Sequence, residues 1–220
     1  MIKAVLFDMD GVIVDTEPLH TKAYYMMFEH YNMEVSRKLY ESFTGQSTLN
    51  VCKALCDTFG LDCNPEDLVQ HKRTSFTSLF HNDPSLQLLP GILDLIKDYH
   101  NNGLTLILAS SASMFTINNV FTRFELDYYF KAKLSGADLK ASKPHPEIFE
   151  KAADTAGINK NECFVIEDST NGIKAAKSAG IYCVGYDSLN SKNQDYSQAD
   201  RVINHFNEIN FNIVKNTMVF

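Results

Sequence analysis

Polar side chains that could do chemistry stand directly after three apolar segments of the sequence. The apolar segments are residues 2–7, 104–109 and 163–166, and the polar residues after them are Asp8 with Asp10, Ser110 with Ser111, and Glu167 with Asp168. Short apolar runs of this kind are typical of strands that are buried on both faces of a sheet. In a parallel sheet all strand carboxyl ends lie at one edge, where ligands bind. We therefore expect these six residues to converge on one site.

Four carboxylates in one site indicate a metal ion. Like charges that share a site repel and raise each other's pKa, and a divalent cation relieves this cost. An all-oxygen site without His or Cys favours a hard ion, and room for phosphate and water favours Mg²⁺. Each acid taken alone has a plainer interpretation, since Asp168 and Ser169 could simply cap a helix over residues 172–179. The three strand ends taken together favour a site.

The rest of the second half alternates between helix and strand patterns. Helical spacing covers residues 92–99, with the helix ending near Asn102-Gly103, and also 114–124, 146–156 and 173–179, and further strands are predicted at 181–184 and 202–203. Alternating strands and helices indicate a parallel sheet covered on both faces. The predicted fold class is α/β, with a Rossmann-like doubly wound parallel sheet.

A helical segment interrupts this pattern near the start of the chain. From Asp15 to residue 85 the apolar residues recur at helical spacing, and no convincing strand intervenes. We therefore expect a small α-helical cap domain over 15–85, inserted into an α/β core domain made of 1–14 and 86–220.

Composition excludes several classes of protein. The net charge is −7, and the longest Lys/Arg cluster is the pair Lys72–Arg73, so we expect no nucleic-acid partner. Apolar runs fall far short of the ~20 residues that a membrane span needs. The first residues lack the pattern of a targeting signal, so we expect a cytoplasmic protein. We also expect a monomer.

The cysteines allow two interpretations. Cys52, Cys56 and Cys63 are close enough in sequence for a metal trio, but the five cysteines of the chain are odd in number and mostly scattered. Reduced thiols packed within helices are the favoured interpretation.

Four motifs carry a resemblance to a known family. The first is Asp8-Met-Asp-Gly-Val-Ile-Val-Asp15-Thr-Glu-Pro, the second Leu108-Ala-Ser110, the third Lys143 within Ser142-Lys-Pro-His-Pro146, and the fourth Ile166-Glu-Asp168-Ser-Thr-Asn-Gly172. Together, and in this order, they resemble the motifs of the haloacid dehalogenase superfamily. The β-phosphoglucomutase-like sugar phosphatases are similar in having a helical cap after the first strand.

The resemblance implies a role for each residue. Asp8 would attack phosphorus and become an aspartyl phosphate. Asp10 would protonate the leaving alcohol and later activate water, and its presence favours phosphate esters over the superfamily's dehalogenation and phosphonate chemistry. Ser110, with the adjacent Ser111, would hold phosphate oxygens, and Lys143 would balance their charge. Mg²⁺ would be held by Asp8, the carbonyl of Asp10 and Asp168, helped by Glu167.

The cap residues bear on the substrate. His20 and Lys72 stand where mutase-like relatives place residues that steady Asp10 and bind substrate, and Gly45-Gln-Ser-Thr48 resembles their specificity loop. The mutases carry there an arginine that grips a second phosphate, and the matching position is Thr48. Threonine cannot replace that bidentate clamp, so hydrolysis of a small phosphorylated metabolite, a sugar or polyol phosphate, is favoured over β-phosphoglucomutase activity. A catalytically silent sugar-phosphate-binding module is a third possibility, which the intact nucleophile Asp8 argues against.

Overall fold

The structure is a computed structural model that describes residues 1–43, 48–188, 191 and 193–217. Its described residues form two compact units, 1–15 with 87–220 and 16–86. The first is called the α/β unit and the second the helical unit, and each is described by itself. Among the described helices, none combines the length and the apolar character that a membrane crossing requires.

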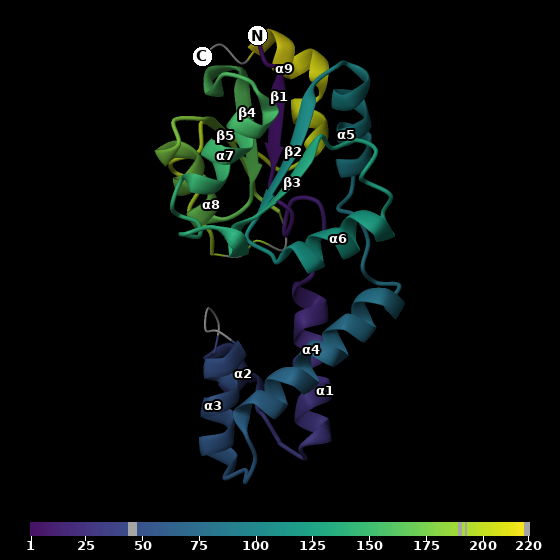
Figure 1. Ribbon diagram of the computed structural model, residues 1–220, viewed down its shortest axis with the longest axis vertical. Coiled ribbons are helices and arrows are strands. Elements are labelled where there is room, and N and C mark those ends of the chain that lie inside the picture. Colours follow the sequence, from purple (N-terminus) through teal and green to yellow (C-terminus); the bar gives the residue numbers. More distant parts are fainter. Residues whose placement is uncertain (44–47, 189–190, 192, 218–220) are drawn as a thin grey trace. The chain divides into compact units, whose positions relative to one another are not determined.

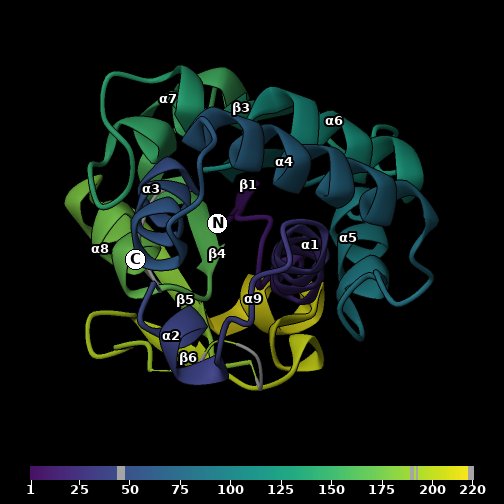
Figure 2. The same ribbon diagram turned by 90° about the horizontal axis from the view of Figure 1, so that it is seen from below.

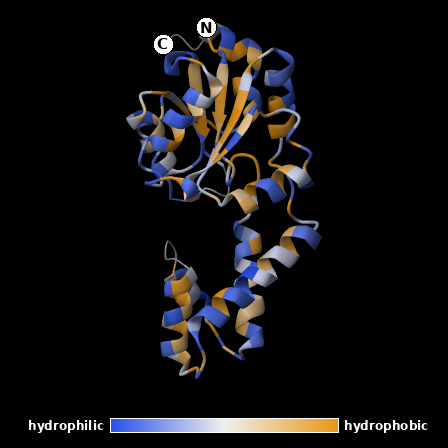
Figure 3. Ribbon diagram, in the orientation of Figure 1, coloured by the Kyte–Doolittle hydropathy of each residue, from blue (hydrophilic) through white to orange (hydrophobic). Residues whose placement is uncertain are grey.

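The α/β unit is built on a six-stranded parallel sheet (Figure 1). The strand order is β3-β2-β1-β4-β5-β6. The strands are β1 (Ala4–Phe7), β2 (Thr105–Ser110), β3 (Ala132–Ser135), β4 (Cys163–Glu167), β5 (Tyr182–Tyr186) and β6 (Arg201–Ile203). Every residue of β1 and β4 is buried, because each pairs on both edges and is covered on both faces. Figure 3 shows these central strands as the hydrophobic part of the unit.

Helices cover the two faces of this sheet (Figures 1 and 2). On one face, α7 (Glu147–Ala156) and α8 (Thr170–Ser178) bury alanines and isoleucines against Ala4, Leu6 and Val165. On the other face, α5 (Ile92–Asn101) and α6 (Met114–Arg123) lie with the aromatic cluster around Phe7 and Tyr99. The remaining elements are α9 (Phe211–Thr217) and the 3₁₀ helices η1 (Gly136–Asp138), η2 (Lys160–Glu162) and η3 (Phe206–Ile209).

The predicted fold class, a doubly wound parallel α/β sheet with an inserted helical segment, is confirmed. One strand differs from the sequence pattern, which does not predict β3. Its residues Ala132 to Leu134 are half-buried, because β3 is an edge strand with a single neighbour. A short, half-polar edge strand carries too weak a hydrophobic signal to be recognised.

The described residues of the helical unit form four helices around a separate core. They are α1 (Glu17–His30), α2 (Arg37–Glu41), α3 (Thr48–Phe59) and α4 (Pro65–Asn82). The core includes Met27, Leu55 and Leu68, and also the buried thiols of Cys52 and Cys56. Within the described part of the chain, no group of three metal-ligating side chains includes a cysteine. Cys52, Cys56, Cys163 and Cys183 are buried, Cys63 is half-buried, and all five thiols are free of disulfide bonds, in agreement with the favoured interpretation of packed thiols.

Candidate active site

The strand register brings Asp8 and Glu167 to one edge of the sheet. Phe7 pairs with Leu108 of β2 on one side and with Ile166 of β4 on the other, so the residue after each lies at the same level. The amide of Asp8 donates to the carbonyl of Ile166 at 3.0 Å, so the hydrogen-bond ladder between β1 and β4 includes the backbone of Asp8. Asp8 is 7% exposed and Glu167 is 1% exposed. Two acids are therefore buried next to each other on adjacent strands.

Lys143 is the cation that pairs with both of these acids. Its Nζ donates to Oδ1 of Asp8, and to Oε1 of Glu167 at 2.7 Å. Burial alone would lower the pKa of Lys143, but the carboxylates of Asp8 and Glu167 outweigh it and raise this pKa. Lys143 therefore stays charged and is held in place by two partners.

Glu167 is fixed by the helix that follows it. Its Oε2 accepts from the amide and the hydroxyl of Ser169, at 2.8 and 2.9 Å. Ser169 is the residue that caps α8, since its Oγ accepts from the amide of Gly172 at 3.0 Å. A Cβ at Gly172 would lie 1.7 Å from Oε1 of Glu167, so this position requires glycine. Glu167 is thus committed on one oxygen to Lys143 and on the other to Ser169.

Asp168 lies beside Asp8 and Glu167. The cap of α8 is Ser169 and not Asp168. The hydroxyl of Ser191 donates to its Oδ2 at 2.5 Å. Burial and the neighbouring charge of Glu167 raise the pKa of Asp168 to about 7, against the lowering effect of the Ser191 bond. The backbone of Gly11 packs on the same carboxylate, because a Cβ there would lie 2.0 Å from Oδ2.

The donor set fits a hard divalent cation. Carboxylate oxygens of Asp8, Glu167 and Asp168 all lie within 4.8 Å of one another. Burial also raises the pKa of Asp8 well above its ordinary value, in spite of Lys143. Burial above all, together with the neighbouring acids, thus disfavours the charged forms of Asp8 and Asp168, and a bound cation would favour them. Oxygen ligands of this kind suit Mg²⁺ and its hard relatives.

Of the other predicted residues of this edge, Ser110 ends β2, and Asp10 and Ser111 lie in the turns that follow β1 and β2. Asp10 is half-buried, in a turn closed by the bond from the amide of Gly11 to the carbonyl of Val14 at 2.7 Å. Ser110 is 2% exposed, and its Oγ accepts from the amide of Ala112 at 3.1 Å. Ser111 is exposed. Amides and hydroxyls at a strand end are groups that bind phosphate oxygens.

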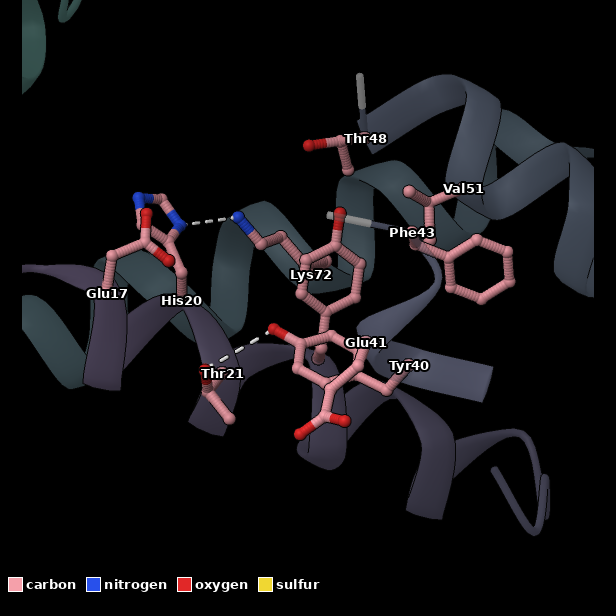
Figure 4. A pocket seen from close by; sticks show the side chains of 10 residues that line it. Glu17, His20, Thr21, Tyr40, Glu41, Phe43, Thr48, Val51 and Lys72 are labelled. Carbon is pink, nitrogen blue, oxygen red and sulfur yellow. Dashed lines mark hydrogen bonds between the residues drawn. The ribbon is translucent and has the colours of Figure 1, made fainter. Parts of the chain in front are cut away.

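Three of the predicted residues of the helical unit, His20, Thr48 and Lys72, line a pocket of about 530 Å³ (Figure 4). The ammonium group of Lys72 and Nδ1 of His20 are 2.8 Å apart, and Thr48 lies at the start of α3. Gly45 falls outside the described residues. The further lining residues are Glu17, Thr21, Tyr24, Tyr40, Glu41, Phe43 and Val51.

Several of these groups carry no signal in the sequence. Ser191 sits in a polar stretch without periodicity, so nothing local marks it as the partner of Asp168. Tyr24 and Tyr40 read as part of the apolar faces of helices, although both line the pocket. Gly11 could have been found, because glycine directly after Asp10 indicates close backbone approach as well as a turn.

Comparison with known proteins agrees with this geometry. A sequence profile of the haloacid dehalogenase-like hydrolases matches residues 5–186. The fructose-1-phosphate phosphatase YqaB of Escherichia coli is 29% identical, over 82% of this chain and 94% of that protein. The β-phosphoglucomutase of Bacillus subtilis is 30% identical, over 84% and 83%. The crystal structure of CbbY from Rhodobacter sphaeroides in complex with phosphate has a TM-score of 0.77 at 26% identity, covering 94% of this chain and 96% of that one.

The chain belongs to the haloacid dehalogenase-like hydrolases and is an enzyme of the phosphoric monoester hydrolase type.

Proposed function

We propose that this protein is a Mg²⁺-dependent phosphatase that hydrolyses a small phosphorylated sugar or polyol through an aspartyl phosphate on Asp8. The observation that carries the proposal is the buried Asp8 carboxylate, paired with Lys143 and adjacent to Glu167 and Asp168. A carboxylate in a dry, cation-lined site is suited to attack phosphorus, because its charge is balanced without bulk water.

In the first half-reaction, a carboxylate oxygen of Asp8 forms a bond to phosphorus as the ester P–O bond breaks. Asp10 gives its proton to the departing alkoxide oxygen, so that a neutral alcohol leaves. Lys143 stays charged and offsets the negative charge on the transferring group. Ser110 and the amides that follow it receive phosphate oxygens.

In the second half-reaction, water attacks the phosphorus of the aspartyl phosphate. Asp10, now ionised, takes a proton from this water, and the acyl phosphate bond breaks to return the Asp8 carboxylate and inorganic phosphate. The same residue thus acts first as acid and then as base.

Mg²⁺, when bound, would supply charge neutralisation at the phosphate and at the nucleophile. Asp8 and Asp168 are the carboxylates that would hold it, with the carbonyl of Asp10. Glu167 supports the site through Lys143 and Ser169, since both of its oxygens already accept hydrogen bonds.

β-Phosphoglucomutase activity is the second candidate, favoured by the relative of that name in Bacillus subtilis. A phosphomutase must hold a substrate with two phosphates. The described lining of the helical unit's pocket offers a lysine and a histidine but no arginine. By the family resemblance, Thr48 matches the position of the mutase arginine. This supports hydrolysis.

The test uses the whole chain with Mg²⁺ and a panel of sugar monophosphates, and measures released phosphate. A parallel reaction contains β-glucose 1-phosphate and a bisphosphate primer, and follows glucose 6-phosphate. We expect phosphate release, which Asp8→Asn abolishes. Isomerisation without phosphate release would establish the mutase, and undiminished turnover by Asp8→Asn would refute the mechanism.

A further inference from the structure

Two of the five cysteines stand where the chain turns from α3 to α4. Cys56 lies in the last turn of α3, and Cys63 directly precedes Asn64, the residue that caps α4. We propose that Cys56 and Cys63 are a redox-sensitive pair of thiols, which a small disulfide oxidises to an intramolecular disulfide that joins the end of α3 to the start of α4. The proposed phosphatase function uses neither residue.

The turn after α3 brings the chain back toward Cys56. Gly60 has φ +62°, a left-handed conformation that commonly ends helices. The amide of Leu61 donates to the carbonyl of Cys56 at 3.1 Å, so the chain folds back on the last turn of α3. Cys63 follows two residues later and packs against the core cluster that includes Cys56. The turn therefore makes neighbours of two cysteines that six residues separate in the sequence.

The two thiol groups also interact with each other. The Cys63 thiol is a hydrogen-bond partner of the Cys56 thiol. Burial above all, and then the charge and the hydrogen bond of the Cys63 thiol, raise the pKa of Cys56. A hydrogen bond between thiols places the sulfur atoms close together, so small side-chain movements can bring them to the S–S bonding distance of about 2 Å.

The two cysteines differ in their access to a reagent. Cys63 is half-buried, whereas Cys56 is 8% exposed and Cys52, one turn earlier on the same face of α3, is 0% exposed. Cys163 and Cys183 are also 0% exposed. A reagent in solution therefore meets Cys63 first, and Cys56 is placed to react with whatever forms on Cys63.

Acidic residues around the pair determine which reagent suits it. Asp57 and Asp62 are exposed and directly follow Cys56 and precede Cys63 in the sequence. The charge of Asp57 contributes to the raised pKa of Cys56, after burial and the Cys63 thiol. A surface lined by one sign of charge attracts ions of the opposite sign and repels ions of its own. We therefore expect a cationic disulfide such as cystamine to react faster than an anionic one.

Two thiol–disulfide exchanges complete the oxidation. The Cys63 thiol loses its proton, and its sulfur attacks one sulfur of cystamine to form a mixed disulfide and release a cysteamine thiolate. The Cys56 thiol then loses its proton, and its sulfur attacks the Cys63 sulfur and releases the second cysteamine thiolate. The two released thiolates take up the two protons through the solvent. Two electrons thus pass from the protein to cystamine, which is reduced to two molecules of cysteamine.

The test treats the whole folded chain with cystamine at pH 8, quenches it with acid, and digests it with trypsin without reduction. Cleavage after Lys53 and Lys72 gives a peptide of residues 54–72, which contains Cys56 and Cys63 and no other cysteine. We expect this peptide to become lighter by the mass of two hydrogen atoms, and dithiothreitol to restore the original mass. Free thiols, counted after unfolding, should fall by two, from five to three.

Variants separate the two steps. Cys56→Ala should trap cysteamine on Cys63, because the second exchange has lost its nucleophile. Cys63→Ala should leave Cys56 at least about 10-fold less reactive, because burial protects its sulfur. Cys52→Ala is the matched control, since it removes a thiol from the same face of α3, and it should form the disulfide like the wild type.

Two further comparisons test the geometry and the charge. The urea-unfolded wild type is the reference for chance encounter of the two sulfurs, and it should give about 10-fold more mixed disulfide relative to internal disulfide than the folded chain does. Dithiodiglycolate, an anionic disulfide, should oxidise the folded chain about 10-fold more slowly than cystamine does, relative to the same two reactions of the free amino acid cysteine.

Several results would overturn the proposal. An unchanged peptide, or cysteamine that stays on Cys63 of the folded wild type, would show that the sulfurs cannot join. Loss of the disulfide in Cys52→Ala would assign it to the wrong pair. Equal product ratios in the folded and the unfolded chain would show that the fold does not bring Cys56 and Cys63 together.

Discussion

Lys143 joins two buried acids of adjacent strands. It pairs with Asp8 and with Glu167, and its own side chain is 6% exposed. Removing one partner from a buried ion pair leaves the other charge uncompensated, which is far more costly than the loss of a surface pair. The residue that we propose to balance charge during phosphoryl transfer is thus also one on which the stability of the fold depends.

Lys143→Met should therefore affect both activity and stability. We expect kcat to fall about 10³-fold, because the charge on the transferring group is no longer offset. The free energy of unfolding should fall by about 3 kcal/mol in urea denaturation. Lys133→Met is the control, since Lys133 pairs with an exposed Asp127 at the sheet's edge. Full activity of Lys143→Met would contradict this role.

Ser191 is a positioning residue for Asp168. Its hydroxyl donates to Oδ2 of Asp168, and its amide is held in turn by Oγ of Ser188 at 3.1 Å. We expect Ser191→Ala to raise the dissociation constant for Mg²⁺ about 10-fold, because groups that orient a metal ligand affect metal affinity by this order. Isothermal titration calorimetry of the chain with Mg²⁺ measures this directly. The exposed Ser197, in the same polar stretch, is the control, and equal affinities for both alanine variants would refute the assignment.

At the scale of elements, the turn after β1 must let the backbone reach Asp168. Gly11 has φ +80°, and a Cβ there would lie 2.0 Å from the Asp168 carboxylate. Gly103 has the same φ with nothing within 4 Å, so the two glycines differ in their surroundings and not in backbone strain.

This pair predicts a specific difference between two substitutions. Gly103→Ala should cost about 1 kcal/mol, from the positive φ alone, and leave activity intact. Gly11→Ala should cost more than this and reduce kcat/KM about 100-fold, because the carboxylate must move. Thermal unfolding and steady-state kinetics measure both quantities, and equal effects of the two changes would contradict the close approach described here.

The strand ends of the site could be predicted from sequence because two signals coincide there. An apolar run followed at once by Asp8, or by Glu167 and Asp168, marks both the strand and its carboxyl end, and β4 and β1 indeed pair in parallel. The clustering of the carboxylates of Asp8, Glu167 and Asp168 then follows from topology.

Other features depend on tertiary contacts and leave no local trace. Ser191 reaches Asp168 across 23 residues, and Lys72 reaches His20 across 52, so neither bond is visible in any short window. The sequence also leaves open which of Asp168 and Ser169 caps α8, and in the structure Ser169 is the cap while Asp168 accepts from Ser191. β3 was beyond prediction because an edge strand needs few buried side chains.

On the scale of the whole molecule, the two units should respond to pH separately. Burial lowers the pKa of Lys72 to about 8, while the charge of Glu17 opposes this and that of Arg73 adds to it. The groups that face it do not titrate near pH 8, because the pKa of His20 is about 4, that of Cys52 about 11, and that of Tyr24 is raised. Lys72 is therefore charged below pH 8 and loses its proton above it.

Lys72 is one of the residues predicted to bind substrate, so we expect kcat/KM for a sugar monophosphate to fall several-fold as pH rises through about 8. The reference is kcat/KM for acetyl phosphate, which has no sugar body. Dividing one kcat/KM value by the other removes the effect of titrating groups in the α/β unit, because these groups act on both substrates. Lys72→Met should abolish the pH dependence of this ratio, and a ratio that falls equally in that variant would show that another group is responsible.

The central claim is that Asp8 itself carries the phosphoryl group. The most direct measurement is acid quenching of the working enzyme, borohydride reduction of the acyl phosphate and mass spectrometry of the peptide that contains Asp8. Reduction converts an aspartyl phosphate to homoserine, so we predict homoserine at position 8 after turnover, and none without substrate or in Asp8→Asn. Turnover that leaves Asp8 unmodified under conditions where the intermediate accumulates, or a modified residue elsewhere, would contradict the account.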